Sequence, residues 1–418
     1  MNILILGAGA REHALAWAVL QNPKCDRLVV APGNAGIARI AELADLPIED
    51  ADAVAGFAAE TAMDLVIIGP EAPLAAGVAD ALRAAGIAVV GPGAAAARLE
   101  SSKAFTKSIC DACGAPTAAY AHFTDAAAAA DYVRQRGAPL VIKADGLAAG
   151  KGVTMAETEA QALEAVEAVF AGAFGSPELV IEEWLMGEEA SLFVLCDGET
   201  AVPIGTAQDH KRAFDGDKGP NTGGMGAYSP APVMTDDVTA RAMDEIVHPT
   251  LAEMARRGTP FQGILYAGLM IEKGAPKLIE YNTRLGDPEA QVLMMRLGGQ
   301  VLDLMQACAM GGLADIRPVF AEDHALTVVL AAKGYPEAYE KGSVIGGLEA
   351  PPETSSQIVF HAGTARTGGA VTAAGGRVLS ATARGASLRE ARDRAYALAE
   401  AIDWPEGFYR RDIGWRAL

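Results

Sequence analysis

Two side chains that carry oxygen, Glu280 and Asn282, alternate along an apolar run that predicts a strand. Because successive side chains of a strand point to opposite faces, residues two positions apart share one face. Hard Mg²⁺ takes few protein oxygens and keeps its other positions for phosphates and water. Arg284, Asp287 and Glu289 follow at once, so this segment is either a metal site beside a charged centre or a cluster of surface charges.

A glycine-rich loop, residues 146–152, lies between two predicted strands, Leu140–Ala144 and Val153–Ala156. It is not a Walker loop, which needs the pattern GxxxxGK[ST] followed by a helix. Backbone N–H groups of such a loop can close on phosphates and Lys151 adds charge, although a plain hairpin is the alternative. Lys143 favours a phosphate site, because a lysine in a buried strand usually has an anionic partner.

A second glycine turn follows the first predicted strand, with Gly7, Gly9 and Glu12 in the order GxGxxE. The dinucleotide fingerprint has a third glycine at the last position, which allows close packing of helix on strand, so Glu12 argues against NAD. A sugar phosphate held at the N-terminus of the following helix is the better chemical fit. A turn that binds no ligand is the remaining alternative.

Several glutamates cluster at residues 182–189, where two predicted strands, residues 179–182 and 191–196, join. Such a bend can hydrogen-bond adenine and ribose, or it can be an ordinary solvated turn. Taken alone, the cluster is more simply explained as a turn.

The elements that must position these groups fall into two patterns. Predicted strands at residues 2–6, 27–30, 64–68 and 87–90 alternate with helical segments and end in turns containing Gly or Pro. This alternation predicts a doubly wound parallel sheet, in which ligands bind beyond the carboxyl ends of the strands. After residue 101 the strands and helices segregate, which indicates an α+β arrangement.

Composition excludes several classes of protein. A length of 418 residues, 51% hydrophobic and 21% charged, is typical of a globular chain of several domains. The net charge of −19 would repel a nucleic-acid backbone. Five cysteines, an odd number, indicate reduced thiols. With neither a signal-peptide pattern nor an apolar run long enough to span a bilayer, the sequence predicts a cytoplasmic protein that binds no membrane.

Taken together, the motifs resemble the ATP-grasp superfamily and, within it, the phosphoribosylamine–glycine ligase family (glycinamide ribonucleotide synthetases). The segments that carry the resemblance are GAREHAL at 9–15, APGNAG at 31–36, KADGLAAGKGV at 143–153, QDHKR at 208–212, GPNTGGMGAYSP at 219–230 and RLGDPEAQ at 284–291. The last two are highly specific, whereas other ATP-grasp enzymes share the glycine loop.

The resemblance implies that ATP, glycine and 5-phosphoribosylamine react through glycyl phosphate to glycinamide ribonucleotide in de novo purine biosynthesis. It implies catalytic roles for Arg284, Lys143 and Asp287, and Mg²⁺ or Mn²⁺ on Glu280 and Asn282. The implied ATP-binding residues are Lys103, Lys143, Gly146, Gly150, Lys151, Gly152, Glu182, Glu183, Trp184, Leu185 and Glu189. The implied substrate-binding residues are Gly9, Arg11, Glu12, Gly33, Asn34, Glu71, Asp209, Lys211 and Gly224.

The resemblance also implies three domains: a substrate-binding α/β domain at 1–101, an ATP-grasp domain at 102–322 with a mobile lid at about 118–191, and a small α+β domain at 323–418. Transient contact with neighbouring pathway enzymes is a further expectation. Two alternatives stay open. A carboxylase or formyl-transferring ATP-grasp enzyme would keep the nucleotide motifs but lack the segments at 219–230 and 284–291, and a non-catalytic nucleotide-binding module would be expected to lose Lys143, Glu280 or Arg284.

Overall fold

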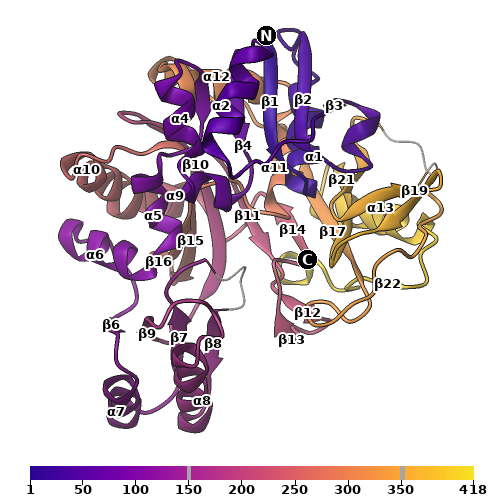
Figure 1. Ribbon diagram of the computed structural model, residues 1–418. Coiled ribbons are helices and arrows are strands. Elements are labelled where there is room, and N and C mark those ends of the chain that lie inside the picture. The colour runs from indigo at the N-terminus through magenta and orange to yellow at the C-terminus, as the bar shows by residue number, and fades with distance from the viewer. Residues whose placement is uncertain (148–151, 349–353) are drawn as a thin grey trace.

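The computed structural model describes residues 1–147, 152–348 and 354–418. Its N-terminal region is a parallel sheet in the order β3-β2-β1-β4-β5, which confirms the predicted doubly wound sheet (Figure 1). The strands are β1 (Asn2–Gly7), β2 (Arg27–Pro32), β3 (Glu42–Leu43), β4 (Leu65–Ile68) and β5 (Ala88–Val90). The helices are α1 (Ala10–Val19), α2 (Ala51–Glu60), α3 (Glu71–Ala75), α4 (Val78–Ala84) and α5 (Ala94–Ser101), with a 3-10 turn at Ile37–Arg39.

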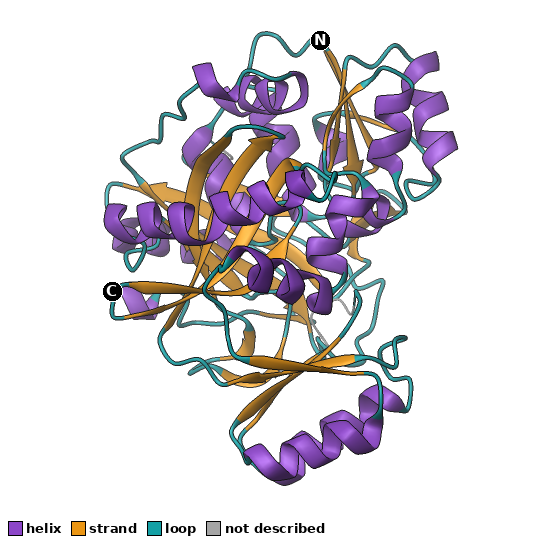
Figure 2. Cartoon of the chain, turned by 90° about the vertical axis from the view of Figure 1, so that its left-hand side faces the viewer, coloured by secondary structure: helices purple, strands orange, loops and turns teal. Residues whose placement is uncertain are grey.

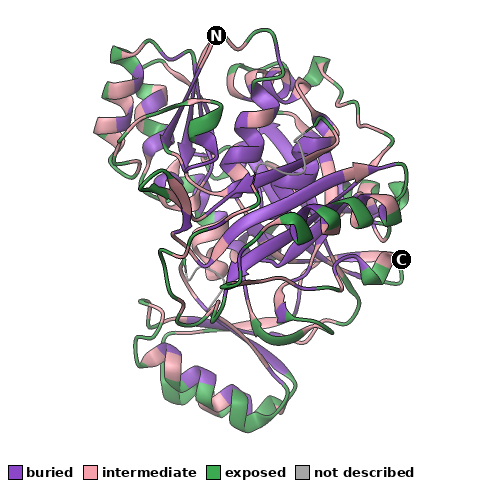
Figure 3. Ribbon diagram, turned by 90° about the vertical axis from the view of Figure 1, so that its right-hand side faces the viewer, coloured by how far each residue is buried: buried purple, intermediate pink, exposed green. Residues whose placement is uncertain are grey.

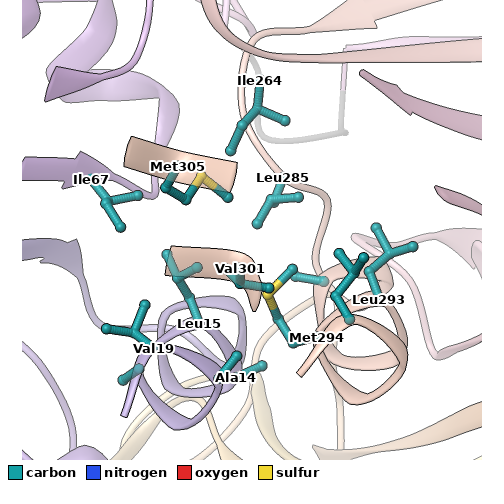
Figure 4. Close-up of a cluster of buried hydrophobic side chains, with 14 of the residues drawn as sticks. Ala14, Leu15, Val19, Ile67, Ile264, Leu285, Leu293, Met294, Val301 and Met305 are labelled. Atoms are coloured by element: carbon teal, nitrogen blue, oxygen red, sulfur yellow. The ribbon is translucent and has the colours of Figure 1, made fainter. Parts of the chain in front are cut away.

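Alternate side chains of β1 enter two different cores, as a sheet covered on both faces requires. Leu4 and Leu6 pack with residues of α2 and α4, whereas Ile3 and Ile5 pack with residues of α1. The second core continues into two helices from the middle of the chain, α11 (Glu289–Leu297) and α12 (Gln300–Met310) (Figure 4). The N-terminal sheet is therefore packed directly against the central part of the protein.

A separate antiparallel sheet, in the order β6-β9-β7-β8, projects from the rest of the molecule (Figures 1 and 2). Its elements are β6 (Tyr120–Phe123), α7 (Ala126–Arg136), β7 (Leu140–Ala144), β8 (Val153–Ala156), α8 (Glu159–Phe170) and β9 (Leu179–Glu183). Leu140, Ile142 and Ala144 of β7 face a core shared with α7 and α8. By strand alternation, Val141 and Lys143 face the opposite side, where the candidate site lies.

The largest sheet has nine strands, in the order β16-β15-β10-β11-β14-β17-β21-β18, with β22 beside β17. The strands are β10 (Glu188–Asp197), β11 (Ala201–Asp209), β14 (Gly226–Ser229), β15 (Gln262–Glu272), β16 (Ala275–Asn282), β17 (His324–Ala332), β18 (Gln357–His361), β21 (Arg377–Gly385) and β22 (Gly407–Phe408). Because β14 pairs with β17, this sheet runs without a break past residue 322. The predicted domain bounds at 101/102 and 322/323 stay a prediction.

Helices α9 and α13 pack on this sheet near β16 and near β21, respectively. The remaining elements are α6 (Lys103–Cys113), α9 (Asp236–Ala242), a π-helical turn (Met243–Val247), α10 (His248–Arg256), α13 (Leu388–Ala401), 3-10 turns at Leu313–Asp315 and Trp415–Ala417, and the strand pairs β12 (Arg212–Phe214) with β13 (Lys218–Asn221) and β19 (Thr364–Thr367) with β20 (Ala370–Ala373). Buried residues of α13 pack on β17 and β21, and its other side is exposed (Figure 3). Within the described ranges, no helix is long and apolar enough to cross a membrane.

Candidate active site

A cavity of about 860 Å³ lies where the β6-β9-β7-β8 sheet, named the lid sheet from here on, meets the large sheet and the N-terminal domain. The predicted site residues that line it are Arg11, Glu71, Lys103, Lys143, Gly146, Gly152, Glu182, Glu183, Leu185, Glu189, Asp209, Lys211, Glu280, Asn282, Arg284 and Asp287. Trp184, Gly9, Glu12, Gly33, Asn34 and Gly224 do not line it. Gly150 and Lys151 lie outside the described residues.

At one end of the cavity, two buried lysines share one carboxylate. The ammonium of Lys143 lies 2.9 Å from Glu182 Oε2, and that of Lys107 lies 3.2 Å from Glu182 Oε1. Lys143 also donates to the carbonyl of Ile279 at 3.0 Å. The anionic partner that a buried Lys143 requires is therefore present within the chain. Lys107 was not among the predicted residues, although it follows Lys103 by one helical turn on α6.

Lys103 is tied to the start of the glycine loop. Its ammonium donates to the carbonyl of Gly146 at 2.6 Å, and burial lowers its pKa despite the nearby carboxylate of Glu280. The N-terminus of α6 explains this placement. Ser102 caps the helix by accepting from the Phe105 N–H, and Asp145 accepts from both the Ser102 hydroxyl and the Ala104 N–H. The cap therefore fixes Lys103 beside the loop.

Glu280 and Asn282 lie on β16, opposite Gly268 and Tyr266 of β15. Burial acts to raise the pKa of Glu280, but nearby cations, chiefly Lys211 and Lys143, hold it below its ordinary value. The donor set is thus one ionised carboxylate and one amide oxygen, which suits a hard divalent cation that also binds phosphate oxygens. Among the described residues, no group of three or more His, Cys, Asp or Glu side chains could hold a metal by itself.

Arg284 is held between carboxylates from two other elements. Its guanidinium lies 2.8 Å from Glu100 Oε1 and 3.4 Å from Glu71 Oε2, and it donates to Asn282 Oδ1 at 3.2 Å. Burial opposes its charge, but Glu100 and Glu71 raise its pKa, so the guanidinium stays charged. Glu100 also accepts from the backbone N–H and the hydroxyl of Thr283. No local signal in the sequence pointed to Glu100, which holds Arg284 beside Asn282.

A further part of the cavity wall holds several carboxyl groups close to one lysine, Lys211. Lys211 pairs with Glu189. Burial, together with Glu289 and Glu189 and against Lys211, raises the pKa of Asp209 to about 7. Glu289 is itself buried, which raises its pKa, and it accepts from the Tyr266 hydroxyl at 3.0 Å. In this region carboxyl groups outnumber the one lysine, which favours a cationic ligand.

Glu12 explains the departure from the dinucleotide fingerprint. Its carboxylate accepts from the Gly9 N–H at 2.6 Å and from Arg11 Nε at 2.6 Å. A Cβ atom on Gly69 would come within 2.1 Å of this carboxylate, so Glu12 fills the space between the ends of β1 and β4. Its carboxylate caps α1, and one N–H at the expected phosphate position is already occupied.

In the loop after β2, the predicted substrate-binding residues Gly33 and Asn34 make contacts within the protein. The amide of Asn34 donates to the carbonyls of Ala8 at 2.9 Å and His361 at 2.7 Å, and its oxygen accepts from the N–H of Gly36. Gly33 has a left-handed φ of +71°, and a Cβ there would approach Leu43 to 2.4 Å. Of the predicted N-terminal residues, Arg11 and Glu71 are those that reach the cavity.

Arg377, which was not predicted from the sequence, contacts both of the most specific sequence segments, 219–230 and 284–291. Arg377 Nη1 donates to the carbonyls of Gly223 at 2.7 Å and Asp287 at 2.5 Å, and it lies 3.6 Å from Asp287 Oδ1. A Cβ on Gly224 would come within 2.4 Å of Pro288, so this close approach requires glycine. Arg377 lies at the start of β21 without any local signal in the sequence, since only the three-dimensional fold brings it to Asp287.

Comparison with known proteins gives a consistent result along the chain. Family models described as the N, ATP-grasp (A) and C domains of phosphoribosylglycinamide synthetase match residues 1–100, 101–290 and 325–416. A phosphoribosylamine–glycine ligase from Mesorhizobium japonicum is 59% identical over 420 residues, covering 100% of this chain and 99% of its own.

Solved structures agree with this assignment. A phosphoribosylamine–glycine ligase from Thermotoga maritima superposes with a TM-score of 0.86 at 32% identity, over 99% of this chain and 100% of that one. The biotin carboxylase domain of a 2-oxoglutarate carboxylase from Hydrogenobacter thermophilus has a TM-score of 0.73 at 16% identity, over 98% and 91%, which shows a shared fold. With three family models in sequence order and a relative of the same length at 59% identity, the chain belongs to the phosphoribosylglycinamide synthetase family.

Proposed function

We propose that this protein joins glycine to 5-phosphoribosylamine with the hydrolysis of ATP, giving glycinamide ribonucleotide, ADP and phosphate in de novo purine biosynthesis. One observation carries the proposal: a single cavity is lined by the buried lysines, by the Glu280–Asn282 pair and by the carboxylate-rich Asp209–Lys211 region. A reaction that passes a phosphoryl group and then an acyl group between three substrates needs such a continuous, charge-lined space.

In the first step, a carboxylate oxygen of glycine attacks the γ-phosphorus of ATP, the bond to the β-phosphate breaks, and glycyl phosphate and ADP form. Two anions must approach, so neutralising their charge is the main catalytic task. Lys103 and Lys143 are proposed to hold the phosphates, with residues 146–152 covering them. Arg284, kept charged by Glu100 and Glu71, is proposed to stabilise the transferring phosphoryl group.

In the second step, the amine of phosphoribosylamine attacks the acyl carbon of glycyl phosphate. The bond from that carbon to the phosphate oxygen breaks, inorganic phosphate leaves, and the nitrogen loses one proton as the amide forms. Exclusion of water is essential here, because water would hydrolyse the acyl phosphate. The glycine loop and the lid sheet above the cavity are proposed to provide this exclusion.

Nucleotide and metal are assigned to the end of the cavity near β9 and β16. Residues 182–185 would contact adenine through backbone groups, and Glu189 the ribose. A Mg²⁺ or Mn²⁺ ion held by Glu280 and Asn282 would supply positive charge to the phosphate oxygens. The ionised state of Glu280 supports this assignment.

Glycine and the sugar are assigned to the remaining walls. Asp209 is the preferred residue for the glycine ammonium, with Asp287 as the second candidate. Arg11 and Glu71 reach the cavity and would contact the ribose phosphate, while Lys211 would assist at the Asp209 end. Gly9, Glu12, Gly33, Asn34 and Gly224 would act indirectly, through the loops that they shape.

The proposed setting is the cytoplasm, where the five unpaired cysteines would stay reduced. An assay of ADP release tests the function. Turnover should require glycine and freshly made phosphoribosylamine together. Bicarbonate and formate are the alternative substrates to test. Bicarbonate is chosen because the fold is shared with a biotin carboxylase domain, and formate because formyl-transferring ATP-grasp enzymes are the other alternative. Equal turnover with either of them would contradict the proposal.

A further inference from the structure

Residues 410–416, which we call the C-terminal strap, lie along residues 209–217, which we call the 209–217 segment. Figure 1 shows the C-terminus beside the hairpin of β12 and β13. The two stretches are about two hundred residues apart in the sequence, and polar groups join them. Their contacts lie beside the cavity and are not used by the proposed chemistry.

Arg410 is the buried anchor of the strap, with a side chain that is 0% exposed. Its guanidinium lies 2.9 Å from Asp217 Oδ1 and 2.7 Å from Asp412 Oδ2, and it donates to the carbonyl of Arg212 at 3.0 Å. Removing one partner from a buried charge leaves the other uncompensated, which is costly. Arg410 therefore strongly favours the arrangement in which Asp217 stays beside it.

Further contacts attach the strap along the length of the 209–217 segment. Arg416 Nη2 lies 2.5 Å from Asp217 Oδ2, and the N–H of Gly414 donates to His210 Nε2 at 2.9 Å. Burial lowers the pKa of His210, so this imidazole is neutral and its Nε2 can accept. The N–H of Gly216 donates to Asp412 Oδ2 at 2.8 Å.

The 209–217 segment forms part of the cavity wall. Asp209, Lys211, Arg212 and Asp217 line the cavity, and Arg416 of the strap lines it too. His210 does not line the cavity, and its Nε2 accepts from the N–H of Gly414. The strap thus contacts the same segment that contributes Asp209 and Lys211 to the cavity.

We propose that the C-terminal strap is a positioning element for the part of the active site that contains Asp209 and Lys211 and is proposed to bind glycine and the sugar. Arg410 and Arg416 hold Asp217, Gly414 holds His210, and these contacts fix Asp209 and Lys211 in the place where glycine and the sugar amine must meet. The inference rests on the proposed function. It assigns the strap to substrate placement and leaves the phosphates and adenine of ATP to Lys103, Lys143 and Glu182. Only the pair of Lys211 with Glu189, the residue proposed for the ribose, links this wall to the nucleotide.

Arg416→Met tests the proposal, because it removes one charge from a partly exposed side chain and should leave the fold intact. Arg411→Met is the matched control. It makes the same chemical change in the same strap, but the Arg411 side chain is 68% exposed and pairs with Glu400, while its contact to Asp215 comes from the backbone N–H. Asp217→Asn is a second variant, since Asp217 has a φ of +54° that asparagine also tolerates.

We expect Arg416→Met and Asp217→Asn to lower kcat/KM for glycine and for phosphoribosylamine by about tenfold or more, as misplaced reacting groups do. The KM for ATP should rise much less, because the Lys211–Glu189 pair is the one contact between this wall and a residue proposed to bind ATP. Arg416→Lys should restore part of the loss. Amide hydrogen exchange across residues 209–217 should accelerate in Arg416→Met and not in Arg411→Met.

Two results would overturn the inference: kinetics of Arg416→Met that match those of Arg411→Met, or a rise in the KM for ATP equal to that for glycine, which would make the strap a general stabiliser. A wild-type protein that releases no ADP with glycine and phosphoribosylamine would instead refute the proposed function itself, and the inference with it. The two failures are therefore distinguished within one set of assays.

Discussion

The ammonium of Lys143 lies 2.9 Å from Glu182 Oε2, across the neighbouring strands β7 and β9 of the lid sheet. Both side chains are nearly fully buried, and Lys107 approaches the other oxygen of the same carboxylate. The lysine proposed to hold an ATP phosphate is therefore oriented by a protein carboxylate. If Lys143 holds a phosphate as proposed, that phosphate shares Lys143 with Glu182. We therefore infer that Glu182 is a positioning residue as well as part of the segment proposed to bind adenine.

Glu182→Gln should lower both stability and nucleotide affinity. Two buried ammonium groups would lose their shared counter-charge, and breaking a buried pair costs about 3 kcal/mol of unfolding free energy. The KM for ATP should rise while the KM for glycine stays close to wild type. Denaturant unfolding and steady-state kinetics measure both effects. Glu178→Gln, which changes an exposed carboxylate just before β9 that pairs with His122, is the control; an equal loss of stability there would contradict the account.

Glu280→Gln should abolish most activity. It keeps the shape of the side chain but removes the charged member of the metal pair, so we expect kcat to fall by about two decades or more, roughly 3 kcal/mol of transition-state stabilisation, and the Mg²⁺ requirement to rise. Titration of ADP release against Mg²⁺ measures this, and near-normal kcat at the usual Mg²⁺ level would show that the metal site is misplaced. From the sequence, relief of carboxylate repulsion would keep stability constant or raise it slightly. The structure places Lys211, Lys143, Lys103 and Arg284 around Glu280, so stability should fall.

The affinity for glycine should depend on pH through Asp209. Burial and the neighbouring Glu289 and Glu189, opposed by Lys211, raise the pKa of Asp209 to about 7. Below that pH the carboxyl is increasingly protonated and loses its attraction for the glycine ammonium. The KM for glycine should therefore rise as pH falls below about 7, with a limiting slope of tenfold per pH unit for a single group. Asp209→Asn should have a high KM that no longer changes with pH; an unchanged pH profile in this variant would exclude Asp209 from the glycine site.

Stability should decrease in mild acid because of buried histidines. Burial lowers the pKa of His13, of His210 and, to about 4, of His361. Between the unfolded value near 6.5 and these folded values, the unfolded chain binds more protons, so the unfolding free energy falls as pH decreases from about 6.5 toward 4. Thermal unfolding measured over this range tests the sign. His13→Gln should reduce the slope, and an unchanged slope in this variant would contradict the assignment to His13.

Much of the fold could be predicted because its signals are local. The alternation of strands and Gly/Pro turns gave the parallel sheet, and the apolar flanks of the glycine loop gave the β7–β8 pair, with Lys143 opposite Val153. Strand β11 was not predicted, since Pro203 and Gly205 interrupt its apolar pattern and a bulge accompanies them. The pairing of β14 with β17 joins residues about one hundred positions apart, which no local pattern encodes.

The candidate site divides in the same way. Charged residues in apolar strands, such as Lys143, could be recognised from the sequence as needing an oppositely charged partner. Their partners within the chain could not, because Glu100 and Arg377 come from distant elements that carry no motif. The sequence also suggested a phosphate position at the start of α1, where the carboxylate of Glu12 proves to reach back to the Gly9 N–H. Whether a charged or polar group pairs within the protein or remains open to a ligand depends on three-dimensional packing, which the local sequence does not encode.

Phosphorylation of the glycine carboxylate by ATP is the central claim, and isotope transfer measures it directly. With glycine carrying oxygen-18 in both carboxylate oxygens, one labelled oxygen should remain in the new amide carbonyl and the other should leave with phosphate. Mass spectrometry of the products should therefore find one oxygen-18 in the inorganic phosphate released per turnover, in the presence of phosphoribosylamine. Phosphate that contains no oxygen-18, with both labelled oxygens retained elsewhere, would contradict the account.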